Sequence, residues 1–179
     1  MNRRKFIQGT LAAAGATALP TGQALAAIYQ ALTQVVTDVD ALSGAGEQVS
    51  LQKSMVQEFS DSLRGRLLLP GNEGYDKARR VINGSIDKHP ALIAQCKGAA
   101  DVSQSVSFAR EHGLLLAVKC GGHSFSGKST CDGGMMIDLS PLQGVRVDPA
   151  ARTAWVAGGS LLGSMDEETM GFGLVTTAG

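Results

Sequence analysis

The feature that most constrains this chain is a glycine-rich loop that directly follows an apolar run. The apolar run covers residues 114–118, and the loop at 119–129 combines three glycines, several serines and one histidine, His123. Glycine permits positive φ angles and lets backbone N–H groups come close to a ligand, because it has no Cβ. Successive inward N–H groups hold an anion, typically a phosphate. The sequence therefore predicts a phosphate-binding loop at the end of a strand.

The loop also matches the nucleotide-binding pattern G-x-x-x-x-G-K-[ST] over residues 122–129. A loop of that class opens directly into a helix, whose N–H groups and dipole complete the site. Here residues 130–134 are Thr-Cys-Asp-Gly-Gly, which favour a turn, and an apolar strand follows at once. This context argues against a nucleotide hydrolase.

Hydrophobic periodicity predicts the elements around the loop. Ahead of it we expect strands and helices in this order: strand 66–69, helix 75–81, strand 91–96, a helix capped by Asp101 and ended by Gly113, and strand 114–118. The strand–helix–strand order forms a βαβ unit, and ligands bind at the carboxyl ends of such strands. After the loop we expect a small antiparallel or mixed sheet and one helix, at 135–139, 144–148, 153–157 and from Ser160 to about Met170. Trp155 is expected in the core.

The first residues have the pattern of an export signal, with Arg3-Arg4-Lys5 ahead of a weakly apolar stretch and a small-residue cleavage pattern at residues 24–26. The arginine pair resembles a twin-arginine signal, although a Sec signal or a short amphipathic start are alternatives. We therefore expect three parts: an export signal at 1–26, amphipathic lead-in helices at 27–60, and a binding domain at 61–179. The expected location is periplasmic or secreted, with the twin-arginine machinery as a partner.

Composition and cysteine spacing argue against a nucleic-acid-binding protein, a membrane anchor and a metal site. Lys and Arg number 16 and Asp and Glu also number 16, so the chain lacks the basic excess of a nucleic-acid-binding protein. No stretch after the signal is long and apolar enough to predict a stable membrane anchor. The cysteines lack metal-site spacing, so no metal is expected. Cys120 and Cys131 could pair in an oxidising compartment, but small buried thiols are the favoured interpretation.

The residues 119–127, Lys-Cys-Gly-Gly-His-Ser-Phe-Ser-Gly, are followed at 132–140 by Asp-Gly-Gly-Met-Met-Ile-Asp-Leu-Ser. Together they resemble the flavin-binding signature of berberine-bridge-enzyme-like oxidases, within the vanillyl-alcohol oxidase / p-cresol methylhydroxylase superfamily. Flanking pieces resemble the family in the same order, so the resemblance covers about Ser60 to Gly179. It implies an α+β fold with two subdomains: a small βαβ subdomain, then the start of a mixed or antiparallel sheet subdomain.

The resemblance implies FAD as the cofactor and His123 as its covalent attachment point. A neutral imidazole is a nucleophile near neutral pH, although a histidine that only hydrogen-bonds is the alternative. The other residues that the resemblance assigns to FAD binding are Cys120, Gly121, Gly122, Ser124, Phe125, Ser126, Gly127, Thr177 and Gly179. No cysteine for a second flavin attachment occurs at 173–179, so a single attachment is expected.

The resemblance further implies an FAD-dependent oxidase that removes hydride from an alcohol, sugar or phenolic substrate and passes the electrons to dioxygen. Two alternatives remain, a flavin dehydrogenase with another acceptor and an inactive FAD-binding fragment. The chain ends at Gly179 in an expected strand and turn. We therefore expect a C-terminally truncated chain whose substrate domain lies downstream, and no catalytic residue is identified.

Overall fold

The computed structural model describes residues 38–177, so the expected export signal lies outside the described residues. The described part begins with an antiparallel hairpin, β1 (Val39–Leu42) and β2 (Gln48–Leu51), followed by helix α3 (Lys53–Ser62). The lead-in helices expected over 27–60 are therefore wrong for residues 39–51. Val39 and Ala41 are buried while Asp40 between them is exposed, which is the two-residue period of a strand.

A four-stranded sheet forms the centre of the fold, in the order β3-β4-β6-β5. Its strands are β3 (Arg66–Leu68), β4 (Leu92–Gln95), β6 (Met135–Asp138) and β5 (Leu116–Lys119). β3 is antiparallel to β4, whereas β4 and β5 both run parallel to β6. The predicted βαβ unit is present, and β6 lies between its two strands.

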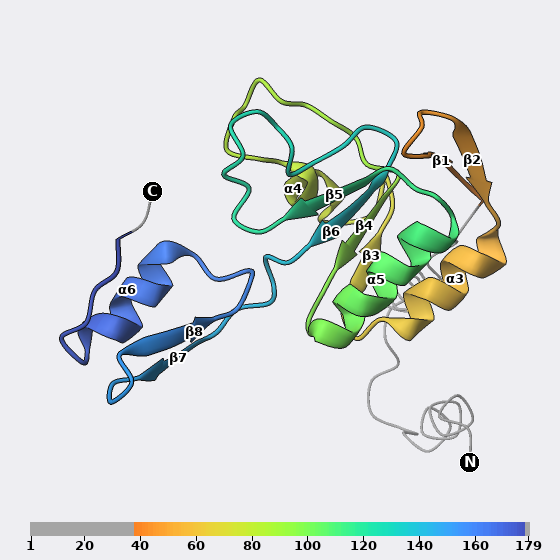
Figure 1. The fold of residues 1–179 in the computed structure, drawn as a ribbon. Coiled ribbons are helices and arrows are strands. Elements are labelled where there is room, and N and C mark those ends of the chain that lie inside the picture. The colour runs from red at the N-terminus through yellow and green to blue at the C-terminus, as the bar shows by residue number, and fades with distance from the viewer. Residues whose placement is uncertain (1–37, 178–179) are drawn as a thin grey trace, which may run out of the picture. The chain divides into compact units, whose positions relative to one another are not determined.

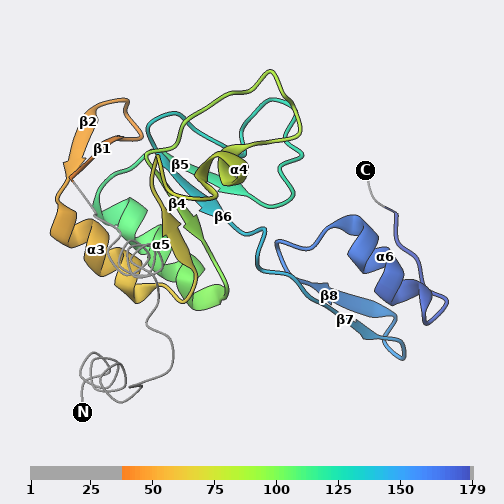
Figure 2. The same cartoon turned by 180° about the vertical axis from the view of Figure 1, so that it is seen from behind.

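Helices cover both faces of this sheet. α5 (Ala99–Glu111) lies beside α3 on one face, as Figures 1 and 2 both show. The opposite face packs against α4 (Tyr75–Arg79), whose Tyr75 and Ala78 join a buried cluster with Met136. Burial on both faces explains why β6 is a continuous apolar run rather than an alternating one.

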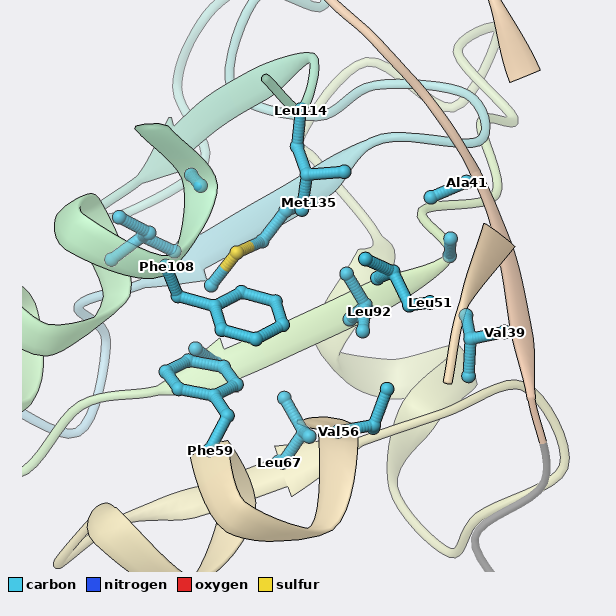
Figure 3. Close-up of a cluster of buried hydrophobic side chains, with 14 of the residues drawn as sticks. Val39, Ala41, Leu51, Val56, Phe59, Leu67, Leu92, Phe108, Leu114 and Met135 are labelled. Carbon is cyan, nitrogen blue, oxygen red and sulfur yellow. The ribbon is translucent and has the colours of Figure 1, made fainter. Parts of the chain in front are cut away.

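The larger core cluster joins the sheet to α3, α5 and the β1–β2 hairpin. Figure 3 shows the stacked rings of Phe59 and Phe108, whose centroids lie 4.2 Å apart. Val39 and Leu51 of the hairpin belong to the same cluster. The hairpin is therefore part of the domain core and not a separate lead-in.

Asp101 has a different role from the predicted one. The N-cap of α5 is Gly98, and Asp101 lies in the first turn of the helix. Its buried carboxylate accepts hydrogen bonds from three backbone N–H groups, those of Lys97 (2.8 Å), Arg64 (2.9 Å) and Gly65 (3.1 Å). Asp101 thus connects the start of α5 to the segment that enters β3. Gly113 ends the helix with a φ of 61°, as predicted.

The last described region contains β7 (Val145–Asp148), β8 (Thr153–Val156) and α6 (Leu162–Met170). β7 and β8 pair antiparallel, as expected. Trp155 is 72% exposed, so the prediction that it lies in the core is wrong. Its strand belongs to a two-stranded sheet in which every β8 residue is exposed.

Ser160 does not cap α6, because the N-cap is Leu161. The Ser160 hydroxyl instead accepts a hydrogen bond from the Gly144 N–H and donates one to the Gly144 carbonyl. Across residues 38–177, no helix has both the length and the apolar composition needed to cross a membrane.

Candidate functional site

The glycine loop begins where two parallel strands end at the same edge of the sheet. Lys119 of β5 lies opposite Asp138 of β6, and the loop starts at the next residue, Cys120. A cavity of about 390 Å³ opens at this edge. Its lining residues come from four segments: Arg80, Val81, Ile82, Lys119, Cys120, Gly121, His123, Ser140, Gln143, Gly159 and Leu161.

Three glycines of the loop lie where a larger residue would be strained or would displace a neighbouring side chain. Gly122 and Gly127 have φ angles of 73° and 70°, in the left-handed region that disfavours residues with a Cβ. A Cβ on Gly127 would also lie 2.8 Å from Ile86 Cγ2, and one on Gly121 would lie 2.9 Å from Leu161 Cδ2. The glycines therefore allow both the turn and the close approach of neighbouring side chains.

No helix follows the loop. Residues 128–134 consist of turns, bends and irregular backbone. The expectation that a turn rather than a helix follows the loop is confirmed for this described segment, and a nucleotide-binding loop of this pattern requires a helix there.

The carbonyl groups and the N–H groups of the loop differ in their hydrogen bonding. Neighbouring residues donate to the carbonyls of Gly122, Phe125 and Gly127. By contrast, the N–H groups of residues 121–126 have no acceptor within residues 38–177. Four of these six residues are exposed, so either water or an anion can accept from their N–H groups.

The charges around the cavity also favour an anion. Arg80 and Lys119 line it, and no carboxylate does. Lys119 is only 8% exposed, and its ammonium group donates to the Ala78 carbonyl at the end of α4. Asp138 lies nearby, but its two oxygens accept from Gln95 Nε2 and the Ser140 N–H. Both oxygens of that carboxylate are therefore occupied by hydrogen bonds within the protein.

His123 lies in the wall of the cavity and is exposed. Neither imidazole nitrogen has a hydrogen-bond partner in the part of the chain that the structure describes. Its side chain is therefore available to a ligand.

The three thiols differ in their surroundings. All are free, so the structure does not contain the Cys120–Cys131 pair. Cys96 and Cys131 are buried as favoured, whereas Cys120 is exposed beside the cavity, contrary to that expectation. Burial raises the pKa of the Cys131 thiol to about 11. Of the three, Cys120 is therefore the thiol that a ligand in the cavity can cover.

The structure brings most of the predicted site residues together. Cys120, Gly121 and His123 line the cavity, and the rest of the set 122–127 completes the same loop. Phe125, however, is 79% exposed at the loop tip. Thr177 is exposed and does not line the cavity, and Gly179 lies outside the described residues.

Several lining residues were not predicted. Ser140 lies two residues after Asp138, the last residue of β6, so the rule that ligands bind at strand ends could have identified it. Residues 80–82 and Leu161 carry no such signal. They reach the cavity only because distant parts of the chain fold onto the loop.

The glycine loop lies within a region that is similar to known proteins. Residues 90–178 match the family model described as FAD binding domain. (R)-6-hydroxynicotine oxidase of Paenarthrobacter nicotinovorans is 35% identical over 118 residues, which are 66% of this chain and 26% of the relative. Berberine bridge enzyme-like 9 of Arabidopsis thaliana is 31% identical over 119 residues, 63% of this chain and 22% of the relative.

A solved structure shows the same fold. The crystal structure of 6-hydroxy-D-nicotine oxidase from Arthrobacter nicotinovorans matches with a TM-score of 0.60 and 35% identity, over 63% of this chain and 25% of that one. This match confirms the predicted α+β fold. The chain spans about a quarter of the length of these relatives.

Proposed function

We propose that this chain holds FAD at the glycine loop as part of an FAD-dependent oxidoreductase, because residues 90–178 match the family model described as FAD binding domain. The resemblance stated from the sequence is confirmed by the relatives, which include a hydroxynicotine oxidase and a berberine bridge enzyme-like protein. FAD is the cofactor that this family binds.

One observation of this structure carries the proposal: the loop offers unpaired N–H groups over residues 121–126 beside a cavity lined by two cations and no carboxylate. A diphosphate needs such donors and positive charge. A Cβ at Gly121 would contact Leu161 and narrow this space. The residues present therefore fit the diphosphate part of FAD.

Each group at the site has a proposed role. The loop N–H groups bind the diphosphate, and the buried Lys119 ammonium offsets its charge. His123, free of protein hydrogen bonds within the described residues, is the proposed nucleophile for covalent attachment. When bound, FAD supplies hydride-transfer chemistry, while the protein supplies binding and orientation.

The proposed reaction is removal of hydride from an alcohol, sugar or phenolic substrate, with dioxygen as the electron acceptor. The relative named as an oxidase supports the choice of dioxygen. Comparing oxygen consumption with reduction of an artificial dye separates an oxidase from a dehydrogenase. Turnover with the dye alone would contradict the choice of dioxygen.

We also propose export through the twin-arginine route, supported by the Arg3-Arg4 pair and the cleavage pattern at residues 24–26. Replacing both arginines with lysine is expected to retain the protein in the cytoplasm. Fractionation of cells that carry each version measures this, and unchanged export of the variant would contradict the route.

Acid precipitation of the full-length protein tests the attachment. The wild-type precipitate is expected to keep flavin absorbance, because a covalent bond survives denaturation, whereas His123→Ala is expected to release all of its flavin. Cys120→Ala is the matched control, an alanine in the same cavity wall, and should keep acid-stable flavin. Acid-stable flavin in His123→Ala would contradict the assignment.

A further inference from the structure

Residues 82–88 belong to the connection between α4 and β4. This segment runs beside the glycine loop (Figures 1 and 2). Its polar contacts with the loop all go to loop carbonyl groups. The Ile82 N–H donates to Gly122 O (3.0 Å), Asn83 Nδ2 to Phe125 O (2.8 Å), and Lys88 Nζ to Gly127 O (3.2 Å). We call residues 82–88 the clamp segment.

Within the clamp segment, Asn83 takes part in one hydrogen bond to the loop and two within its own turn. Its Oδ1 accepts from the Ser85 N–H at 3.0 Å, and its carbonyl accepts from the Ile86 N–H at 3.0 Å. The turn therefore fixes which end of the amide faces the loop, since only the amino group can donate. That amino group is aimed at the Phe125 carbonyl.

The bond from Asn83 reaches a part of the loop that has little other support. Among the described residues, it is the only hydrogen bond from outside the loop to residues 123–126. Phe125 itself is mostly exposed, so packing does not hold the tip either. The unpaired N–H groups at 121–126 are in the same stretch, and donors held in one arrangement bind more tightly than mobile ones.

We propose that Asn83 is a positioning residue for the cofactor loop. Its hydrogen bond to the Phe125 carbonyl holds the loop tip so that the neighbouring N–H groups remain directed to the FAD diphosphate. The proposal rests on the proposed function, because it assumes that FAD is the ligand of the loop. Asn83 does not touch the reacting atoms and acts through the loop.

A pair of Asn→Asp variants tests this role. Asn83→Asp keeps an oxygen for the Ser85 N–H but places the other oxygen against the Phe125 carbonyl, so the donor is lost. Asn72→Asp is the matched control. Asn72 Oδ1 accepts from the Leu69 N–H at 2.9 Å, a bond that a carboxylate retains, and Asn72 makes no hydrogen bond with the loop.

Both changes are made in full-length protein that carries His123→Ala, so that FAD binds reversibly and can be titrated. The Kd for FAD is expected to rise about tenfold in Asn83→Asp, which corresponds to about 1.4 kcal/mol, and to stay unchanged in Asn72→Asp. With His123 intact, acid-stable flavin should form more slowly in Asn83→Asp. The melting temperature of the apoprotein should shift no more than in the control.

The outcomes separate the two proposals. Failure of the wild-type protein to bind FAD would overturn the proposed function itself. FAD binding by Asn83→Asp as tight as by Asn72→Asp would overturn the positioning role alone, as would a parallel loss of affinity and apoprotein stability. If Asn83→Asp does not fold, Asn83→Ser replaces it, because its hydroxyl can still accept from the Ser85 N–H but cannot reach Phe125. The same tenfold weakening is then expected.

Discussion

In β6, Met135, Met136 and Ile137 are at most 1% exposed, whereas in β8 Trp155 is 72% and Val156 is 41% exposed. Both strands have four residues and largely apolar sequences. β6 is paired on both edges and packed on both faces, while β8 pairs only with β7 within residues 38–177. The same kind of sequence therefore gives a strand stabilised by burial in one place and a strand stabilised mainly by pairing in the other.

The candidate site draws on both regions. The glycine loop extends from the buried sheet, whereas Gly159 and Leu161 come from the segment after the exposed hairpin. A two-stranded sheet is marginally stable in water by itself. One wall of the cavity is therefore attached to the buried sheet, and the other belongs to the segment that follows a two-stranded sheet.

The largest expected effect is in the buried sheet. Leu92→Ala is expected to lower the free energy of unfolding by about 2–5 kcal/mol, because Leu92 is fully buried and its removal leaves a cavity. Urea unfolding followed by circular dichroism measures this. Leu162→Ala in α6 is the matched control, since Leu162 is about half exposed. Equal losses at the two leucines would contradict the distinction between the regions.

The second-largest effect is expected at a buried polar residue, Asp101, compared with an exposed one. Asp101→Asn is expected to cost about 1–3 kcal/mol at neutral pH, because an amide cannot accept all three backbone N–H bonds. Asp61→Asn, at an exposed position on α3, should change stability by less than about 0.5 kcal/mol. The same urea experiment compares the two variants.

The role of Asp101 also predicts a pH dependence. Burial alone would raise its pKa, but the N–H groups of Lys97, Arg64 and Gly65 outweigh burial and hold the pKa below the ordinary value. The unfolded chain then binds the proton more readily, so this stabilisation is present above about pH 4 and is lost as the pH falls further. Wild-type protein should lose more stability on acidification than Asp101→Asn. Parallel losses would contradict this explanation.

The smallest effect is expected in the hairpin. Trp155→Ala should change the free energy of unfolding by less than about 0.5 kcal/mol, because the ring has few buried contacts to lose. Urea unfolding of the full-length protein measures it. A cost as large as that of Leu92→Ala would show that another surface covers Trp155 and would remove the contrast between the two strands.

Sequence patterns predicted most of the sheet but not its edges. The apolar runs at β4, β5 and β6 and the loop after β5 were identified, because continuous apolar runs and glycine turns are local signals. β1 and β2 lie in the range 27–60 that was assigned to helices, because Val39 in β1 and Val49 and Leu51 in β2 also fit a helical spacing. The insertion of β6 between β4 and β5 has no local signal, since strand order depends on contacts between distant residues.

The candidate site was predicted in a similar, partial way. The loop residues were found because their types are unusual, with Gly122 in a left-handed turn and His123 among glycines. Asn83 and Lys119 were missed as site residues, because an asparagine after a short helix and a lysine at a strand end are ordinary in sequence. Their importance depends on the Phe125 and Ala78 carbonyls, which lie about forty residues away along the chain.

The position of β6 in the sheet makes its pairing depend on the glycine loop that precedes it in the chain. β5 forms the edge of the sheet, and the chain must pass through residues 120–134 before β6 fills the gap between β4 and β5. Closing that connection costs chain entropy. The burial of Met135 and Met136 offsets this cost only when β6 has paired with both neighbours. The conformation of residues 120–134 and the completion of the sheet are therefore linked, because this loop is the connection between β5 and β6.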